Sequence, residues 1–371
     1  MARTASPRAV PRSSFAARVA RWQRSHGRHG LPWQGTRDAY RIWLSEVMLQ
    51  QTQVATVIPY YERFLARFPG VAALAAAPED DVMALWSGLG YYARARNLHR
   101  ASREVVARHG GIFPVDAQAL AQLPGIGRST AAAIAAFASG ERGAILDGNV
   151  RRVLARHAGI AGDPASAAVR SRLWSEAEAR LPRSGIEAYT QGMMDLGADL
   201  CLPRKPLCLL CPVNADCVAR IENRVDDLPG RKTRAPPRRR RIAMLVVLSQ
   251  GEVLLEKRPP SGIWGGLWSL PEVEVSDAPR AALARDWGLE AAEVEAMEPF
   301  EHAFTHFILE IEPWRVRLGK STRLAEGKAG TWMQLCDLDG AALPSPVRKL
   351  LRKVVSGTTF RGETPSTKSR T

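Results

Sequence analysis

The sequence predicts two domains of different class, an all-α domain followed by a smaller α+β domain. Residues 13–222 carry apolar side chains at helical spacing, interrupted by short Gly and Pro breaks such as 68–70. Residues 225–241 hold prolines and a basic run, a composition typical of a linker. Beyond them the apolar residues gather in runs of strand length, which predicts a change of fold class.

The helices of the first domain are expected from apolar spacing and capping residues. Ser14 can cap the first helix, in which Phe15, Val19 and Trp22 share one face. Further helices are expected around 38–67, 79–87, 91–108, 116–121, 128–139, 147–157, 166–180 and 186–199. In the second domain, strands are expected at 242–248, 253–255, 304–311 and 314–318, and a helix at 279–287.

The formal net charge of the 371 residues is +15, which favours a polyanionic partner because bound Lys and Arg release counterions from phosphates. An Arg-rich proteome would give the same excess. No apolar run reaches the roughly 18 residues of a membrane helix, and the N-terminus lacks the apolar core of a secretory signal. The sequence therefore favours a bacterial cytosol and no membrane contact, although the Arg-rich N-terminus would also suit an organelle transit peptide.

Four of the five cysteines lie close together in the chain. They are Cys201, Cys208, Cys211 and Cys217, spaced as C-x6-C-x2-C-x5-C. Such a cluster argues for a metal site in a reducing compartment and against a disulfide framework. Four thiolates suit either tetrahedral zinc or an iron–sulfur cluster, and the spacing does not decide between them. Arg204 and Lys205 are candidates for contact with a phosphate, and the distant Cys336 is expected to be a buried apolar residue.

Residues 123–130, LPGIGRST, precede an Ala-rich helix. Gly125 and Gly127 in a tight turn expose backbone N–H groups at a helix N-terminus, where an anion is favoured. Between two helices, such a turn is typical of a helix–hairpin–helix motif that holds the DNA backbone. A lone G-x-G is weak evidence, and an ordinary interhelical turn is the alternative.

Glu46 and Asp147 are the candidate catalytic carboxyls. Glu46 lies in a mostly apolar run at 43–53, so desolvation is expected to raise its pKa and keep it protonated near neutral pH. Taken singly, Glu46 would be a helix-surface residue and Asp147 an N-cap. Taken together, they supply the acid and the anion that cleavage of a glycosidic bond requires, because its transition state resembles an oxocarbenium ion.

In combination these motifs resemble the helix–hairpin–helix DNA glycosylases of the endonuclease III superfamily, most closely their adenine-specific branch, the MutY family. The resemblance is carried by LPWQ at 31–34, WLSEVMLQQTQV at 43–54, GLGYYARARNL at 88–98, LPGIGRSTA at 123–131, LDGNVRRVLAR at 146–156, QGMMDLGADLC at 191–201 and the cysteine loop. It implies a [4Fe–4S] cluster rather than zinc on the four cysteines. It also implies a monomeric enzyme that acts on double-stranded DNA containing adenine opposite 8-oxoguanine or guanine, here in the bacterial nucleoid.

The resemblance also implies roles for the site residues. Glu46 would protonate adenine on its imidazole ring and then assist attack by water, Asp147 would stabilise or trap the sugar cation, and Asn149 would support the site. Lyase-type members carry a Lys two residues past the second hairpin glycine, where this chain has Ser129. Base removal without efficient strand cleavage is therefore expected.

Further residues match positions that contact bases in this family. Gln51, Thr52, Leu89 and Tyr91 match residues that enter the helix around the opposite base, and Leu89 and Tyr91 suit wedging and stacking after base extrusion. Trp33 would line the adenine pocket. Core packing is the alternative for Tyr91.

The C-terminal half resembles the Nudix-like recognition domain of the same family. The resemblance is carried by residues 263–268 and by Phe304, Thr305 and His306. The latter segment would sense 8-oxoguanine, although His306 alone would be a structural histidine. Nudix hydrolases hold magnesium with glutamates, whereas residues 281–289 contain only Asp286 as an acid, so recognition without hydrolysis is expected.

The predicted organisation follows from these motifs. It comprises a glycosylase domain at 1–224, with a six-helix module at about 31–146 and an iron–sulfur module from 1–30 and 147–224, a linker at 225–241, a Nudix-like domain at 242–356 and a disordered tail at 357–371. Three other functions stay open: a bifunctional glycosylase/lyase, a non-catalytic iron–sulfur protein that binds DNA, and a nucleotide pyrophosphohydrolase. Ser129 argues against the first, and the presence of both carboxyls argues against the second.

Overall fold

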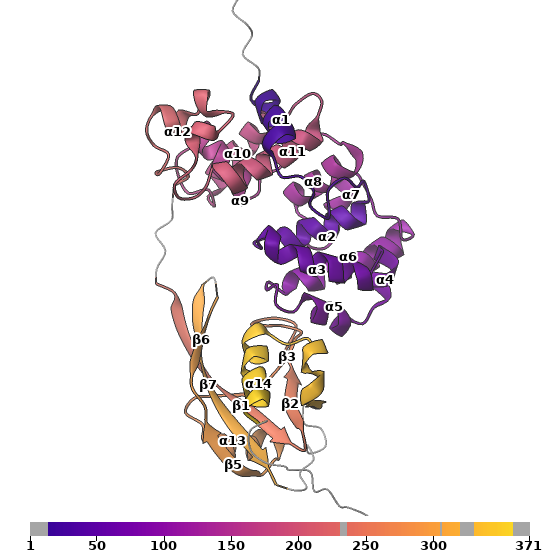
Figure 1. Cartoon of the computed structure of the whole chain (residues 1–371), viewed down its shortest axis with the longest axis vertical. Coiled ribbons are helices and arrows are strands. Elements are labelled where there is room, and N and C mark those ends of the chain that lie inside the picture. Colours follow the sequence, from indigo (N-terminus) through magenta and orange to yellow (C-terminus); the bar gives the residue numbers. More distant parts are fainter. Residues whose placement is uncertain (1–13, 231–235, 305, 320–329, 359–371) are drawn as a thin grey trace, which may run out of the picture. The chain divides into compact units, whose positions relative to one another are not determined.

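The computed structural model describes residues 14–230, 236–304, 306–319 and 330–358 (Figure 1). The chain forms two compact units, a helical unit of residues 1–76 and 97–234 and a C-terminal unit of residues 77–96 and 235–371. An all-α domain followed by a sheet-based domain was predicted, and this fold class is confirmed. The segment 77–96, which the prediction places in the first domain, groups with the C-terminal unit. The detailed domain boundaries stay predictions.

Helices dominate the chain up to residue 221. In order they are α1 Phe15–His26, α2 Ala39–Leu49, α3 Val54–Arg67, α4 Val71–Ala76, α5 Glu79–Trp86, α6 Ala93–His109, α7 Ala117–Leu120, α8 Arg128–Ser139, α9 Gly148–His157, α10 Ala167–Ala179, α11 Ile186–Asp195, a π-helical turn Leu196–Leu200, 3-10 turns Cys208–Leu210 and Asn214–Asp216, and α12 Val218–Ile221. Ser14 caps α1 as predicted, accepting from the backbone N–H of Ala17. Among the described residues, every helix is too short or too polar to cross a membrane.

The helix predicted over 38–67 is divided into α2 and α3. The chain between them turns at Gln51, whose φ of 60° lies in the left-handed region and interrupts helical hydrogen bonding. Asp38 fixes the start of α2 by accepting from the N–H of Tyr40 at 2.9 Å. The side chains of residues 50–53 therefore lie in a turn at the C-terminal end of α2 and not along a helix.

The core of the helical unit lies around the Ala-rich helix α8. Its alanines from Ala131 to Ala136 are buried, and their small side chains let neighbouring elements approach closely. Helix α1 packs on α11 where Gly192 lies, and a Cβ there would come within 2.8 Å of Val19 Cγ1. The first helix of the chain is thereby held against the helix that precedes the cysteine loop.

The C-terminal unit is built on one mixed sheet. Its strands are β1 Arg238–Ser249, β2 Glu252–Lys257, β3 Trp268–Ser269, β4 Glu272–Val273, β5 Ala291–Ala296, β6 Phe300–Ala303, β7 Phe307–Leu318 and β8 Thr331–Gln334. The central path runs β3-β2-β1-β7-β5, with β4 on β1, β6 on β7 and β8 on β2. Strands β1 and β7 pair in parallel, and the other pairs are antiparallel.

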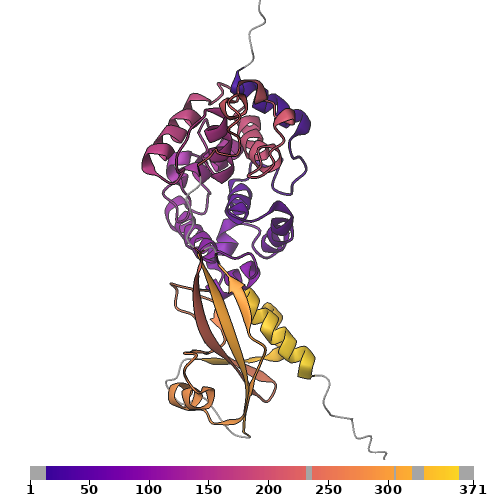
Figure 2. The ribbon, with the colours of Figure 1, turned by 90° about the vertical axis from the view of Figure 1, so that its left-hand side faces the viewer.

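Helices cover both faces of this sheet. Residues 242–247 of β1 are all buried, as expected for a strand between two layers. Ala243, Leu245 and Val247 form one core with helix α13 (Pro279–Trp287). Figure 2 shows α13 and helix α14 (Ser345–Thr358) on opposite sides of the sheet.

Three details of the second domain differ from the sequence prediction. Strand β1 begins at Arg238, inside the predicted linker, because its basic residues pair across the sheet, as Arg239 does with Glu301 at 2.8 Å. Strand β7 runs unbroken through Pro313, whose carbonyl accepts from a neighbouring backbone N–H. Cys336 is exposed, so the prediction that it is buried is wrong. The predicted disordered tail starts at 357, but α14 continues to residue 358, and the rest of the tail lies outside the described residues.

Candidate active site

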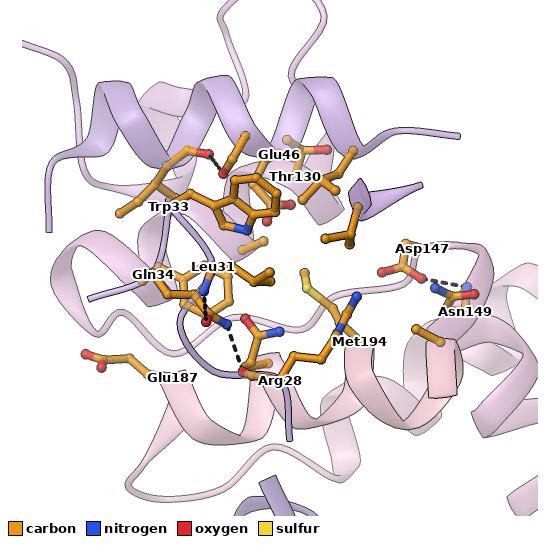
Figure 3. Close-up of a pocket in the computed structure, with 18 of the residues that line it drawn as sticks. Arg28, Leu31, Trp33, Gln34, Glu46, Thr130, Asp147, Asn149, Glu187 and Met194 are labelled. Carbon is orange, nitrogen blue, oxygen red and sulfur yellow. Dashed lines mark hydrogen bonds between the residues drawn. The ribbon is translucent and has the colours of Figure 1, made fainter. Parts of the chain in front are cut away.

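A cavity of about 1310 Å³ lies in the helical unit. Its walls come from the segment 28–37, the end of α2 with its following turn, and the starts of α8 and α9 together with α11. The predicted site residues that line it are Trp33, Glu46, Gln51, Thr52, Ser129, Asp147 and Asn149. In Figure 3, Trp33, Glu46 and Thr130 lie on one side and Asp147 with Asn149 on the other, with Met194 and Arg28 beside the gap. Two carboxyls distant in the chain thus meet at one cavity.

Glu46 is the only carboxyl on α2, a mostly apolar helix. Its neighbours Trp43, Leu44, Val47 and Met48 are buried in the core, so α2 turns Glu46 toward the cavity. Burial raises the pKa of Glu46 to about 8, and the negative charge of Asp147 adds to the rise. This shift favours the protonated form of Glu46 near neutral pH.

Asp147 is the N-cap of α9. Its Oδ1 accepts from the N–H groups of Asn149 at 2.6 Å and Val150 at 2.9 Å, and its Oδ2 makes no hydrogen bond among the described residues. Burial raises the pKa of Asp147, although these two hydrogen bonds and nearby arginines act in the opposite direction. The positive end of the α9 dipole also favours the anion. The residue is both a cap and a carboxylate with one oxygen left for a ligand.

Ser129 and Asn149 are held by the backbone and side chains around Asp147. Ser129 Oγ accepts from the N–H of Leu146 at 2.8 Å, directly before Asp147. Asn149 Oδ1 accepts from Arg152 Nη2 at 2.8 Å, and the same guanidinium donates to the carbonyl oxygens of Gly197 and Cys201. Ser129 brings a hydroxyl and no amine to the cavity.

Sequence reasoning missed Arg28, Gln191 and Met194, which also line the cavity. The fully buried Asp195 organises two of them. It accepts from Arg28 Nε at 2.7 Å and from Gln191 Nε2 at 2.8 Å, which fixes both side chains at the wall. The sequence signal that could have found Gln191 and Met194 is their helical spacing. With Ala198 they share one face of the helix, which places a polar side chain beside a flexible one and a small one.

The hairpin glycines lie outside this cavity, at the turn before α8. Gly125 has a φ of +79°, and a Cβ there would lie 2.8 Å from Asn97 Cβ, so the fold itself requires glycine. Gly127 has a φ of −88°, and a Cβ there would meet nothing within 4 Å. Both glycines are exposed. Gly127 is the N-cap of α8, where glycine is favoured over alanine, and the space beside it is open to a ligand.

Leu89 and Tyr91 belong to the segment 77–96 of the C-terminal unit. Leu89 is only 6% exposed and is buried in this structure. Tyr91 is 45% exposed, and its φ of 50° lies in the left-handed region. Of the two predicted wedge residues, Tyr91 alone is presented to solvent.

The predicted recognition segment follows β6. Phe304 stacks on Phe307, with ring centroids 4.4 Å apart and an interplanar angle of 14°, and also contacts His302 and Trp264. His306 is exposed, and Thr305 lies outside the described residues. The segment therefore carries one anchored aromatic ring and one accessible imidazole.

All four predicted metal-ligating cysteines line one small cavity, next to α9 and the π-helical turn. Burial raises the pKa of the Cys211 thiol to about 12, and Arg156 Nη1 lies 3.4 Å from Cys201 Sγ. Among the described residues, no three Cys, His, Asp or Glu side chains lie close enough to hold a single metal ion. Arg204 and Lys205 are exposed on the adjoining loop.

Two family models match the chain. Residues 44–179 match the HhH-GPD superfamily base excision DNA repair proteins, and residues 243–353 match the NUDIX domain. The adenine DNA glycosylase of Buchnera aphidicola subsp. Acyrthosiphon pisum is 36% identical over 338 residues, which cover 91% of this chain and 96% of that protein. The chain belongs to the adenine DNA glycosylase family.

A second relative and a solved structure are also similar to the chain. The human adenine DNA glycosylase is 33% identical over 418 residues, covering 96% of this chain and 75% of the human protein. A solved thermostable thymine-DNA glycosylase covers 56% of this chain and 95% of its own, with a TM-score of 0.51 and 28% identity. Membership in the adenine DNA glycosylase family makes the chain an enzyme, a hydrolase of N-glycosidic bonds in DNA.

Proposed function

We propose that the chain removes adenine from duplex DNA where adenine lies opposite 8-oxoguanine or guanine, and that it leaves the DNA strand uncut. The observation that carries the proposal is one cavity lined by two carboxyls in different environments. Burial raises the pKa of Glu46 to about 8, while Asp147, whose pKa burial also raises, accepts two backbone N–H bonds at a helix N-terminus that favours its anion. Environments that separate the protonation of two carboxyls are typical of acid and base assignments in glycoside cleavage.

The reaction uses these residues in sequence. Adenine leaves the helix and enters the cavity beside Trp33, and Glu46 protonates its imidazole ring. The bond from the sugar to the base breaks, and its electron pair leaves with the protonated base. Asp147 stabilises the cationic sugar, and water then attacks it while the Glu46 carboxylate accepts a proton from that water. Arg28, Gln191 and Asn149 supply polar groups around the base and sugar.

The opposite strand is read by different residues. Gln51 and Thr52 lie at the turn after α2, on the rim of the cavity, where they suit contact with the helix around the extruded nucleotide. Phe304, Thr305 and His306 sense 8-oxoguanine. The support is that Phe304 is held in an aromatic cluster while His306 is exposed. The enzyme acts as a monomer in the bacterial cytosol.

Strand cleavage would need an amine that forms a Schiff base with the sugar. Ser129 occupies that position and its hydroxyl accepts from Leu146, so this residue offers no such amine. Borohydride should consequently trap no stable protein–DNA adduct. A trapped adduct, together with cleavage at the abasic site, would contradict the monofunctional assignment.

The cysteines hold a [4Fe–4S] cluster in this proposal, with a structural role that orders the loop carrying Arg204 and Lys205 toward phosphate. The residues fit the group, because all four thiols line one cavity and thiolates are the ligands of such clusters. The native protein is expected to be brown and to contain iron and acid-labile sulfide. A colourless preparation that holds zinc would contradict the assignment.

Base release from four duplexes tests the proposed activity. Each duplex carries one adenine, opposite 8-oxoguanine, guanine, cytosine or thymine. Release is expected to be fastest opposite 8-oxoguanine and next opposite guanine. Equal rates opposite all four bases would refute recognition of the opposite base, and no release from any duplex would refute the activity itself.

The pH dependence of base release reports on Glu46. Because the active form has Glu46 protonated and Asp147 ionised, the single-turnover rate is expected to be highest between the pKa of Asp147 and that of Glu46, about 8, and to fall by about tenfold per pH unit above pH 8. Duplex affinity, measured at the same pH values, separates this loss from weaker binding. A rate that stays constant through pH 8 would show that Glu46 is not the acid.

Gly127→Ala is expected to weaken duplex binding by about tenfold or more, the equivalent of one lost hydrogen bond to a phosphate. The added Cβ meets no protein atom, so the Tm is expected to fall only by the small cost of replacing a glycine N-cap. Gly125→Ala is the matched comparison, because its positive φ and the contact with Asn97 should cost about 1–2 kcal/mol of stability. Unchanged duplex affinity of Gly127→Ala would remove this turn from the DNA interface.

A further inference from the structure

The turn at 88–92, which carries Tyr91, is held from both sides within the C-terminal unit. On the side of α5, Ser87 is the C-cap, and its hydroxyl donates to the carbonyl of Leu343 and accepts from Arg348 Nη2 at 3.1 Å. On the side of α6, the Arg96 guanidinium donates to the carbonyl of Gly265. Both clamps connect this turn to segments that are more than 160 residues later in the chain.

The turn itself is strained at Tyr91. A tyrosine with a φ of 50° occupies a region that side chains with a Cβ avoid, and such a conformation persists only where surrounding contacts hold it. Inside the turn, Trp86 Nε1 donates to the Gly90 carbonyl at 3.2 Å, and Arg94 donates to the carbonyls of Leu89 and Gly90. The clamps at Ser87 and Arg96 fix the two ends between which these bonds act.

The Gly265 carbonyl that holds Arg96 is part of a rigid turn. A Cβ on Gly265 would lie 2.4 Å from the Pro260 carbonyl oxygen, so the backbone at 260 and the backbone at 265 are in direct contact across this turn. The neighbouring Gly266 has its Cβ position 3.4 Å from Glu79 Oε1 on α5 and 3.6 Å from Arg96 Cδ. The turn therefore lies against the starts of both helices that flank the Tyr91 turn.

Trp264 joins this rigid turn to the recognition segment. It is 5% exposed, has a φ of 54°, and its ring centroid lies 5.8 Å from that of Phe304 and 5.9 Å from that of His302. Because Trp264 and Gly265 are consecutive, Trp264 links the Phe304 ring to the residue whose carbonyl accepts from Arg96. These contacts form a continuous path from Phe304 to the base of the Tyr91 turn.

We propose that Arg96 is a positioning residue that couples the recognition segment at Phe304 to the Tyr91 turn, through Trp264 and Gly265. The inference rests on the proposed function, in which Phe304 senses 8-oxoguanine and Tyr91 enters the helix. Contact with 8-oxoguanine stabilises one arrangement of Phe304 and Trp264. This arrangement maintains the hydrogen bond from Arg96 to the Gly265 carbonyl and positions Tyr91 to stack on a DNA base. Arg96 thereby raises the rate opposite 8-oxoguanine more than the rate opposite guanine.

The test compares Arg96→Gln with Arg100→Gln, which removes the same charge from the same helix. Arg100 is exposed, and its hydrogen bond goes to Asn97 within α6. Single-turnover rates are measured with adenine opposite 8-oxoguanine and opposite guanine. Arg96→Gln is expected to lower the ratio of the two rates by about fivefold or more, a typical coupling between sites, and Arg100→Gln is expected to preserve it. Equal loss on both duplexes would mean a structural role only and would overturn the proposal.

A double-mutant cycle with Phe304→Ala tests the path itself. Coupling through Trp264 requires that the second substitution add little to the first, so the effects of Arg96→Gln and Phe304→Ala on the rate ratio are expected to be non-additive. Additive effects would overturn the proposal. Ser87→Ala, which leaves Arg96 in place, is expected to slow both duplexes equally. A parent enzyme without preference for 8-oxoguanine would instead refute the proposed function, and the coupling with it.

Discussion

Glu46→Gln lowers the single-turnover rate of adenine release by about 10²–10⁴-fold, the usual contribution of a general acid, while duplex affinity is unchanged. The amide has nearly the same size as the protonated carboxyl and keeps the packing of α2, but it cannot transfer a proton to the base. The expected result is measured with adenine opposite 8-oxoguanine, together with the Kd for the same duplex.

Glu62→Gln is the matched control for this substitution. Glu62 is an exposed residue of α3 and does not line the cavity, so its variant is expected to release adenine at the parent rate. If Glu46→Gln also released adenine at the parent rate, the proton would have to come from another group. The pH profile of the parent enzyme would then have no connection with the raised pKa of Glu46.

Asp147→Asn is expected to lower the rate of base release by about 10²–10³-fold, the typical cost of losing a preorganised group that stabilises charge in the transition state. Asparagine caps helices as well as aspartate does, so α9 and the fold are retained while the negative charge is lost. Single-turnover kinetics and thermal unfolding, measured in parallel, separate these two contributions of the residue.

Asp116→Asn provides the comparison, because Asp116 caps α7 by accepting from the N–H of Ala119 at 2.7 Å and does not line the cavity. The two asparagine variants are expected to melt alike and to differ only in catalysis. A fully active Asp147→Asn enzyme would limit Asp147 to its role as a cap. In that case Asp147 would be an N-cap without a catalytic role.

Much of the candidate site could be predicted because its chemistry lies in short, local motifs. The cysteines, the hairpin glycines and Asp147 each depend on residues within a few positions, and those spacings can be read directly. Arg28 and Gln191 could not be predicted in the same way. Their positions depend on Asp195, a fully buried acid that brings the segment after α1 onto α11. Only the packed structure contains that relation.

The sheet was harder to predict than the helices for a similar reason. Strand β5 has the sequence AAEVEA, which has no strong strand signal of its own. It is extended because Glu293 and Glu295 pair across to Arg317 and Arg315 of β7, at 3.5 and 3.6 Å. The grouping of the segment 77–96 with the C-terminal unit likewise depends on contacts between distant residues, such as that of Arg96 with Gly265.

The hydrogen bonds that hold Asp147 at the first turn of α9 have a consequence for inhibitor design. The anion takes its position from the backbone, so it does not have to rotate or shed water when positive charge develops nearby. A sugar mimic with a permanent positive charge in its ring would bind next to the Asp147 carboxylate without any rearrangement of that side chain. Such compounds should bind far more tightly than neutral analogues of the same ring, because the site complements the reacting state better than the resting nucleotide.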